Sequence, residues 1–289
     1  LNFRLGQREI GGAYVGADGQ LFEVFSKDLD AERLSQNAQI LSQFASSQTG
    51  RVYFLPVYSA FTLYPERLPA FAQEPDERAI LAALGLPESV AVADAYADFL
   101  AHKGEDLYFR TDHHWTQDGA YLAYRAFCEA AGFAPAEDLA AVESAQPFFG
   151  SLFSKAPLWG LAGDRLRLYE IPRKVQVTYD LEQTADSLYT LSALEKKDQY
   201  TVFLDGNHAR VDIETDAGTG RTLVVLQDSF AHALVPFLAN HYDTIVVLDL
   251  RYYNLPVSDV LAEHPGADIL LTYNLSWLAQ DANLFKLLR

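Results

Sequence analysis

Five short apolar segments, interspersed with helical patterns, constrain the fold of this chain more than any other feature. The apolar segments are residues 51–57, 90–94, 223–226, 244–250 and 268–273. Apolar residues at helical spacing cover residues 31–47, 76–84, 116–132 and 257–263. Strands buried on both faces are apolar throughout, and strands that alternate with helices pair in parallel. The sequence therefore predicts a three-layer α/β fold with a mainly parallel sheet between two layers of helices.

Residues 135–221 follow a different pattern. Apolar and polar residues alternate there, and turn residues separate the groups, which are centred on 166–168, 175–179 and 211–213. Such alternation is typical of antiparallel strands. A smaller β segment is predicted at residues 11–22, with a tight turn at Asp18-Gly19. Because no linker or internal repeat is present, we expect a single domain over residues 1–289 with a β-rich insertion at about 135–221.

The charge balance limits the partners of the chain. Its 289 residues include 22 Lys and Arg against 39 Asp and Glu, which gives a formal net charge of -17. Such a charge repels nucleic acid and anionic membrane surfaces, so we expect no nucleic acid partner and a neutral or weakly charged substrate. The sequence has no Walker loop and no Gly-x-Gly-x-x-Gly motif after a strand, and we predict no cofactor. Its single cysteine, Cys128, excludes an intrachain disulfide.

Two polar motifs carry the chemistry that the sequence predicts. The run Asp112-His113-His114-Trp115 precedes a helix, and Ser229 follows the apolar segment 223–226. A serine hydroxyl needs a base, and the base needs a partner that fixes its tautomer. In an extended segment Asp112 and His114 point the same way and His113 points to the opposite face. We therefore predict Ser229 as nucleophile, His114 as base and Asp112 as the residue that orients the base.

Other residues are candidates for binding a substrate or an oxyanion. Asn207 follows Gly206, and Arg251 and Tyr252 follow directly after the apolar segment 244–250. Trp115 adjoins the predicted base. A hairpin turn would also explain Asn207, and a solvated loop would also explain the residues after 244–250.

A metal site is the alternative use of the histidines. Its ligands would be Asp112, His113 and His114, together with His208 or His232. Adjacent histidines rarely converge on one ion, and no pair of histidines lies four residues apart on a helix. We therefore predict no metal.

The motifs, in their order and spacing, resemble those of a known family. Segments 108–116, 206–207, 228–230 and 249–253 are similar to those of the bacterial DHHW proteins. That family in turn resembles the SGNH-hydrolase-like domains of the alginate O-acetylation proteins, in which an Asp-x-His-Trp segment precedes the serine, a permuted order relative to ordinary SGNH esterases. The resemblance implies a flavodoxin-like fold and a triad of Asp112, His114 and Ser229.

The resemblance also implies a place and a partner. We expect an extracytoplasmic protein, either secreted or anchored by a segment outside this sequence, that receives acyl groups from a membrane-bound O-acyltransferase. The predicted function is that of an O-acyltransferase or esterase acting on a polysaccharide or cell-envelope glycan. The alternative is a glycan-binding or assembly module without catalysis. A hydrogen bond between Ser229 and His114 would favour the enzyme.

Overall fold

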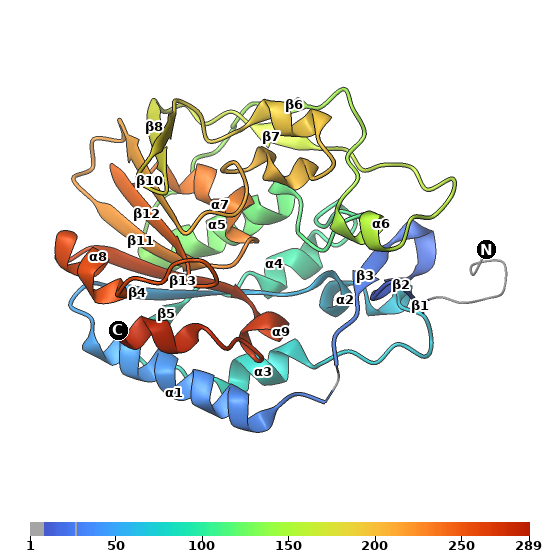
Figure 1. The fold of residues 1–289 in the computed structure, drawn as a ribbon, viewed down its shortest axis with the longest axis horizontal. Coiled ribbons are helices and arrows are strands. Elements are labelled where there is room, and N and C mark those ends of the chain that lie inside the picture. Colours follow the sequence, from blue (N-terminus) through green and yellow to red (C-terminus); the bar gives the residue numbers. More distant parts are fainter. Residues whose placement is uncertain (1–8, 27) are drawn as a thin grey trace.

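The structure is a computed structural model that describes residues 9–26 and 28–289, and its centre is a mixed sheet (Figure 1). Eight strands of the described residues form this sheet in the order β5-β4-β13-β11-β12-β10-β8-β9. The first five are parallel, as the apolar segments predict. Their bounds are β4 Val52–Val57, β5 Val90–Val92, β11 Thr222–Gln227, β12 Thr244–Asp249 and β13 Asp268–Asn274.

Helices cover both faces of the sheet, because successive side chains of each buried strand point to opposite faces. In β11, Leu223 and Val225 pack into one core and Val224 and Leu226 into the other. The first face carries α4 Tyr96–Ala101, α5 Gln117–Ala131 and α7 Ala231–Leu238 (Figure 1). The second carries α1 Ala31–Ser47, α3 Glu77–Ala83 and α8 Val257–Glu263. The predicted three-layer α/β fold is thus confirmed.

The antiparallel insertion is present, and most of it extends the main sheet instead of standing apart. Strand β10 (Arg210–Thr215) pairs with the parallel strand β12, and β8 (Val175–Tyr179) and β9 (Gln183–Ala185) follow outward. Pairing with β10 covers the backbone groups that β12 would otherwise expose at an edge. Strands β6 (Ala141–Glu143) and β7 (Arg167–Tyr169) form a separate pair.

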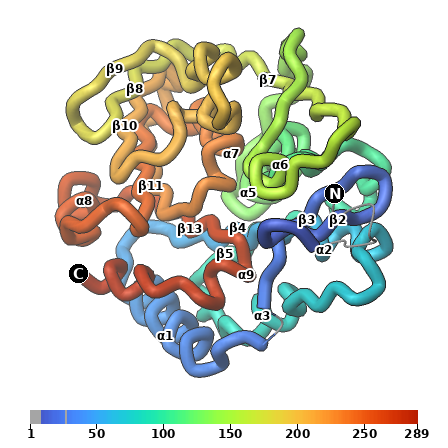
Figure 2. The backbone as a smooth tube through the Cα atoms, turned by 45° about the vertical axis from the view of Figure 1, so that its right-hand side comes forward, coloured from blue at the N-terminus to red at the C-terminus, as the bar shows by residue number. Residues whose placement is uncertain are grey.

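The N-terminal β segment packs against the polar motif. Strands β1 (Glu9–Ile10), β2 (Ala13–Val15) and β3 (Leu21–Glu23) form a small antiparallel sheet beside the short helix α6 (Ser151–Lys155), as both views show (Figures 1 and 2). The buried amide of Gln20 donates from Nε2 to the carbonyl of Phe109 at 2.9 Å. The Leu21 N–H donates to the carbonyl of Arg110. The segment thereby supports the backbone that leads into the histidines.

Two helix ends decide where the site residues lie. Helix α5 begins after Thr116, whose hydroxyl accepts from the Gly119 N–H, and ends at Ala131. Gly132 follows with a left-handed φ of 75° and caps the helix, in agreement with the pattern over 116–132. Helix α7 begins at Ala231, directly after the Ser229 turn. Pro236 therefore lies inside α7, beyond its first turn. Its ring lacks an N–H for the carbonyl of His232, and the helix ends two residues later.

The remaining helices are short. They are α2 Ala60–Leu63, α9 Leu275–Leu278 and the 3-10 turns Ala17–Gly19, Pro65–Arg67, Leu191–Glu195, Gln199–Val202 and Leu284–Leu288. Within the described part of the chain, no helix has the length and apolar character needed to cross a membrane.

Candidate active site

A cavity of about 600 Å³ opens at the carboxyl ends of the parallel strands. The ends of β11, β12 and β13 contribute Gln227, Asp249 and Tyr273 to its wall, and Ser229 and His114 line it together. Ligands bind at this edge in open α/β sheets, because the loops that follow the strands converge there. The two polar motifs thus meet in one cavity, although 115 positions separate them in the sequence.

Ser229 lies in a turn that is fixed on both sides. The buried carboxylate of Asp228 accepts hydrogen bonds from the Phe230 N–H at 3.0 Å and from the Asn274 N–H at 2.6 Å. On the other side, the Trp115 indole N–H donates to the carbonyl of Phe230 at 2.9 Å. Ser229 itself is only partly buried. The turn therefore presents the hydroxyl to the cavity in a fixed position.

His114 joins Ser229 to Asp112. Its Nδ1 lies 2.6 Å from Asp112 Oδ1, and its Nε2 lies 2.8 Å from Ser229 Oγ. An ionised carboxylate only accepts hydrogen bonds, so Nδ1 carries the proton and Nε2 accepts from the serine hydroxyl. The structure therefore brings together the three residues that the sequence singled out, in the arrangement of a nucleophile, a base and an orienting acid.

The local backbone differs from the expected extended segment. Asp112 Oδ1 also accepts from the backbone N–H of His114 at 2.9 Å, which makes the segment a side-chain-capped turn. In this turn His113 does not point to the opposite face, and our prediction for it was wrong. Its ring centre lies 3.8 Å from that of His114, its Nδ1 lies 2.9 Å from Ser151 Oγ, and it lines the cavity.

A second segment, missed in the sequence, completes the environment of Asp112. The Ser151 N–H donates to Asp112 Oδ2 at 2.5 Å. A Cβ at Gly150 would lie 2.2 Å from the same oxygen, so only glycine allows this approach. Burial alone would raise the pKa of Asp112, but the adjacent His113 and His114 and these hydrogen bonds hold it well below its usual range. Asp112 is therefore ionised, as an orienting acid requires.

Tyr200 is the other residue that the sequence did not reveal. Its ring is buried and stacks on the His114 imidazole, with centroids 3.7 Å apart and planes inclined by 3°. Its hydroxyl donates to the carbonyl of Ser229 at 3.2 Å. Burial lowers the pKa of His114 to about 4, the nearby His113 acts in the same direction, and Asp112 opposes both. At neutral pH the imidazole is uncharged and able to accept a proton.

The four candidate contact residues divide into two pairs. Asn207 and Arg251 line the cavity. Arg251 is held by Asp249 through Nε at 2.9 Å and an Nη at 2.5 Å, and it donates to Asn207 Oδ1 at 3.3 Å. Tyr252 is half exposed outside the cavity wall, and Trp115 is buried beneath the turn. The expected substrate contacts of Tyr252 and Trp115 do not fit these positions.

Both histidines are engaged in hydrogen bonds, His114 with Asp112 and Ser229 and His113 with Ser151. Among the described residues, Asp112, His113 and His114 are the one group whose ligand atoms lie close enough for a metal. Two ligands of a tetrahedral zinc ion lie about 3.4 Å apart, whereas His114 Nδ1 and Asp112 Oδ1 are hydrogen-bonded at 2.6 Å. The residues present therefore do not fit a tetrahedral metal in this arrangement.

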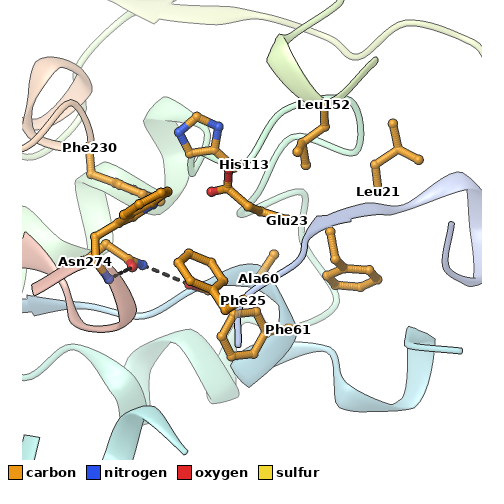
Figure 3. A pocket seen from close by; sticks show the side chains of 12 residues that line it. Leu21, Glu23, Phe25, Ala60, Phe61, His113, Leu152, Phe230 and Asn274 are labelled. Atoms are coloured by element: carbon orange, nitrogen blue, oxygen red, sulfur yellow. Dashed lines mark hydrogen bonds between the residues drawn. The ribbon is translucent and has the colours of Figure 1, made fainter. Parts of the chain in front are cut away.

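A smaller hollow adjoins the cavity. It has a volume of about 10 Å³, which is room for about one water molecule. Figure 3 shows His113, Glu23 and Phe230 around its upper part, with Phe25 and Phe61 below. His113 and Phe230 line both spaces, so apolar rings flank the histidine side of the main cavity.

Comparison with known proteins places these features in a family. The DHHW protein family model matches residues 73–248, which is more than half of the chain. The chain belongs to the DHHW family. A solved DHHW family protein from Eubacterium siraeum is 25% identical to it with a TM-score of 0.80, and the match covers 96% of this chain and 95% of that one. The family resemblance is therefore confirmed.

More distant structures share the fold of this DHHW protein. Bacillus cereus PatB1, solved with a sulfonyl adduct, is 22% identical with a TM-score of 0.75, covering 93% of this chain and 96% of that one. The O-acetyltransferase domain of Pseudomonas putida AlgJ is 17% identical with a TM-score of 0.55, covering 93% of each chain. These likenesses confirm the expected SGNH-hydrolase-like fold. Comparison with curated protein sequences gave no match.

Proposed function

We propose that this protein is a serine-dependent O-acyltransferase or esterase that acts on a polysaccharide or cell-envelope glycan. The observation that carries the proposal is the pair of hydrogen bonds at the cavity, 2.8 Å from Ser229 Oγ to His114 Nε2 and 2.6 Å from His114 Nδ1 to Asp112 Oδ1. A base must lie within hydrogen-bond reach of the proton that it removes. Ser229 would be the nucleophile, His114 the base and Asp112 the orienting acid.

The reaction would proceed in two balanced steps. Ser229 Oγ attacks the carbonyl carbon of an acyl ester while His114 takes the hydroxyl proton, and the proton then passes to the departing alcohol. In the second step an acceptor hydroxyl attacks the carbonyl carbon of the acyl-serine and gives its proton to His114. The bond between the acyl group and Ser229 Oγ breaks, and His114 returns the proton to that oxygen. A sugar hydroxyl as acceptor gives transfer, and water gives hydrolysis.

Asn207 is the side chain best placed among the predicted candidates to bind the oxyanion. A guanidinium can only donate, so its contact with Arg251 fixes the Asn207 carbonyl oxygen on that side. The amide NH₂ group then remains available to the cavity that Asn207 lines. A preorganised donor at the developing negative charge is among the larger contributions to acyl-transfer catalysis.

The structural relatives agree with acyl transfer. The AlgJ domain is described as an O-acetyltransferase, and PatB1 has been solved with a sulfonyl adduct. We extend the proposal to an acetyl group as the acyl unit, a membrane-bound O-acyltransferase as its donor, and an extracytoplasmic location. The net charge of -17 supports a partner other than nucleic acid.

The geometry favours an enzyme over a glycan-binding module without catalysis. A module that had lost catalysis would need neither the contact between serine and histidine nor an open cavity beside it. Here the contact is 2.8 Å, and about 600 Å³ lies open next to it.

Incubation with p-nitrophenyl acetate tests the proposal. We expect intact-protein and peptide mass spectrometry to find an acetyl group on Ser229, and we expect Ser229→Ala to abolish both the adduct and the burst of p-nitrophenol. Ser258→Ala, at an exposed serine in α8, is the matched control and should behave as wild type. Equal acetate release by Ser229→Ala and wild type would remove Ser229 from the role of nucleophile.

A further inference from the structure

One aromatic residue of the cavity wall has no role in the proposed acyl transfer. Trp277 lies on α9, lines the cavity together with Ser229, and is 48% exposed. Of the other two tryptophans, Trp115 is buried and Trp159 is fully exposed outside the cavity wall. A large ring left half in water at the mouth of a cavity is typical of a surface that a ligand covers.

Helix α9 holds Trp277 in a fixed position. The Trp277 N–H donates to Asn274 Oδ1 at 3.1 Å, and the hydroxyl of the buried Ser276 donates to Glu77 Oε1 at 2.7 Å. The ring packs against Phe25 in a T-shaped contact, with centroids 5.2 Å apart and planes inclined by 71°. Because the platform is already ordered, binding a ligand against it requires little loss of side-chain freedom.

A buried polar group on β13, the strand that precedes α9, lacks a partner among the described residues. Tyr273 directly precedes Asn274, lines the cavity, and is 3% exposed. Its hydroxyl makes no hydrogen bond with any of the residues that the structure describes. A buried hydroxyl without a partner is unfavourable, so its presence points to a polar group of a ligand.

Polar side chains continue this wall beyond the tryptophan. Gln280, Asp281 and Asn283 follow α9 and line the cavity. Their amide groups donate and accept hydrogen bonds, and the Asp281 carboxylate accepts them. A sugar ring has an apolar face of C–H groups and a rim of hydroxyls, so a flat indole beside amides and a carboxylate matches it.

The charge of the cavity limits which sugar fits. Six lining residues are acidic, namely Glu23, Asp112, Asp198, Asp228, Asp249 and Asp281. Arg251 is the single Lys or Arg among the described residues that line the cavity, and its Nε and one Nη already pair with Asp249. The acidic residues would repel a carboxylate on the substrate, and no unpaired Lys or Arg among the described lining residues would offset this repulsion. A neutral or amino sugar would not be repelled.

We propose that Trp277, Tyr273 and the segment Gln280–Asn283 form the acceptor subsite and that it takes a neutral or amino sugar in preference to a uronic acid. The sugar ring stacks on Trp277, and one of its hydroxyls pairs with the Tyr273 hydroxyl. This assignment rests on the proposed function, because it names the acceptor of that acyl transfer.

Binding to the Ser229→Ala protein tests the subsite without turnover. Chitotetraose, its de-N-acetylated form and tetragalacturonate serve as the neutral, amino and uronate probes in calorimetric titrations. We expect the first two to bind at least about tenfold more tightly than the uronate at low salt, and the gap to narrow as salt rises from about 0.01 M to about 1 M. Equal binding of the uronate at low salt, or no binding of any probe, would overturn the proposal.

Variants in the same background locate the binding surface. Trp277→Ala and Tyr273→Phe should each weaken chitotetraose binding about tenfold or more. Trp159→Ala, at an exposed tryptophan outside the cavity, should leave it unchanged. Tyr273→Phe removes a hydroxyl that has no partner in the described part of the chain, so it should not lower the melting temperature. It therefore keeps the test valid if Trp277→Ala fails to fold. Unaltered affinity in Tyr273→Phe together with either Trp277→Ala or Trp277→Leu would sink the assignment.

The Ser229 acetylation assay on wild type separates the two proposals. An acetyl adduct without sugar binding would reject the subsite and retain the nucleophile. Sugar binding that depends on Trp277 without any adduct would retain the sugar-binding site and reject both the catalytic role and the assignment of the bound sugar as acyl acceptor.

Discussion

Two buried carboxylates of this molecule share a similar environment and differ in what they reach. Asp112 and Glu77 are 2% and 1% exposed, and each accepts several short hydrogen bonds. Asp112 accepts from the backbone and ring of His114 and from the Ser151 N–H. Glu77 accepts from the Ser59 N–H and from three hydroxyls, those of Ser59, Thr62 and Ser276.

The difference lies in the partners. The histidine bonded to Asp112 has a second nitrogen, and that nitrogen contacts a hydroxyl at the open cavity. The hydroxyls around Glu77 join α2, α3 and α9 to one another, and Glu77 does not line the cavity. Burial raises the pKa of Glu77 despite its four donors, whereas the neighbouring histidines lower that of Asp112. A buried acid with serine neighbours thus indicates a reactive site only when a titratable side chain, such as His114, links the acid to a hydroxyl at an open cavity.

The largest expected effect is a loss of turnover on substitution of Asp112, which we do not expect for Glu77. Asp112→Asn should lower turnover by about ten-thousand-fold, because the amide favours the wrong tautomer of His114. Asn can accept at only one of the two oxygens that Asp112 uses, so the free energy of unfolding should also fall by about 1–3 kcal/mol. Steady-state kinetics with p-nitrophenyl acetate and urea unfolding measure both. Turnover within tenfold of wild type would mean that Asp112 serves only the turn.

The reverse result is expected at the other acid. Glu77→Ala leaves one N–H and three hydroxyls without their acceptor and should lower the free energy of unfolding by about 3 kcal/mol or more. Turnover per folded molecule should fall far less than in Asp112→Asn. Glu88→Ala, at an exposed acid, is the control and should change neither. A stable Glu77→Ala protein that has lost activity would contradict the distinction.

The pH dependence of the rate sharpens the comparison. His114 acts as a base only when neutral, and burial lowers its pKa to about 4. The value of kcat/KM should therefore stay level from neutral pH downward and fall only as the pH drops through about 4. Circular dichroism at each pH separates this loss from unfolding, since below the ordinary histidine pKa the unfolded state binds more protons and stability declines. A rate that already falls near pH 6.5 would place His114 in a more solvated state.

The smallest effect is expected at the neighbouring histidine. His113→Ala keeps both hydrogen bonds of His114 and should lower kcat/KM by less than about tenfold, or 1.4 kcal/mol in the barrier. Loss of the nearby imidazole should also raise the pKa of His114, which His113 lowers, and shift the acid limb of the rate upward. A loss as large as that of His114→Ala would assign His113 a direct part in proton transfer.

The strands and the two polar motifs were predictable because their signals are local. A strand buried on both faces must be apolar, and 223–226 and 244–250 therefore lie within or overlap the observed β11 and β12. The pairing of Asp112 with His114 was also anticipated, although the expected extended backbone is in fact a turn capped by Asp112 itself. The side chains of residues 112 and 114 can meet in an extended segment and also in a turn, so the contact between Asp112 and His114 was predicted correctly. The direction of His113 differs between the two conformations, and its prediction was wrong.

The contacts that complete the site were not predictable from the sequence. Tyr200 meets His114 only because the insertion folds back over the cavity, and nothing near residue 200 distinguishes this ring from any buried tyrosine. Gly150-Ser151 contained a weak signal, a glycine followed by a serine between aromatic residues. Its contact with Asp112 depends on the position of α6 beside β3, which no local pattern encodes.

The position of β11 in the sheet also governs when the chain can acquire reactivity. This strand ends two residues before Ser229 and pairs on its two sides with β12 and β13, both of which come later in the sequence. During synthesis, the serine turn cannot be held in place before residue 274 is available, since the Asn274 N–H bonds the side chain of Asp228. Assembly through such distant contacts is slow compared with helix formation. A nascent chain therefore carries an unreactive serine until the last strand of the parallel sheet has been added.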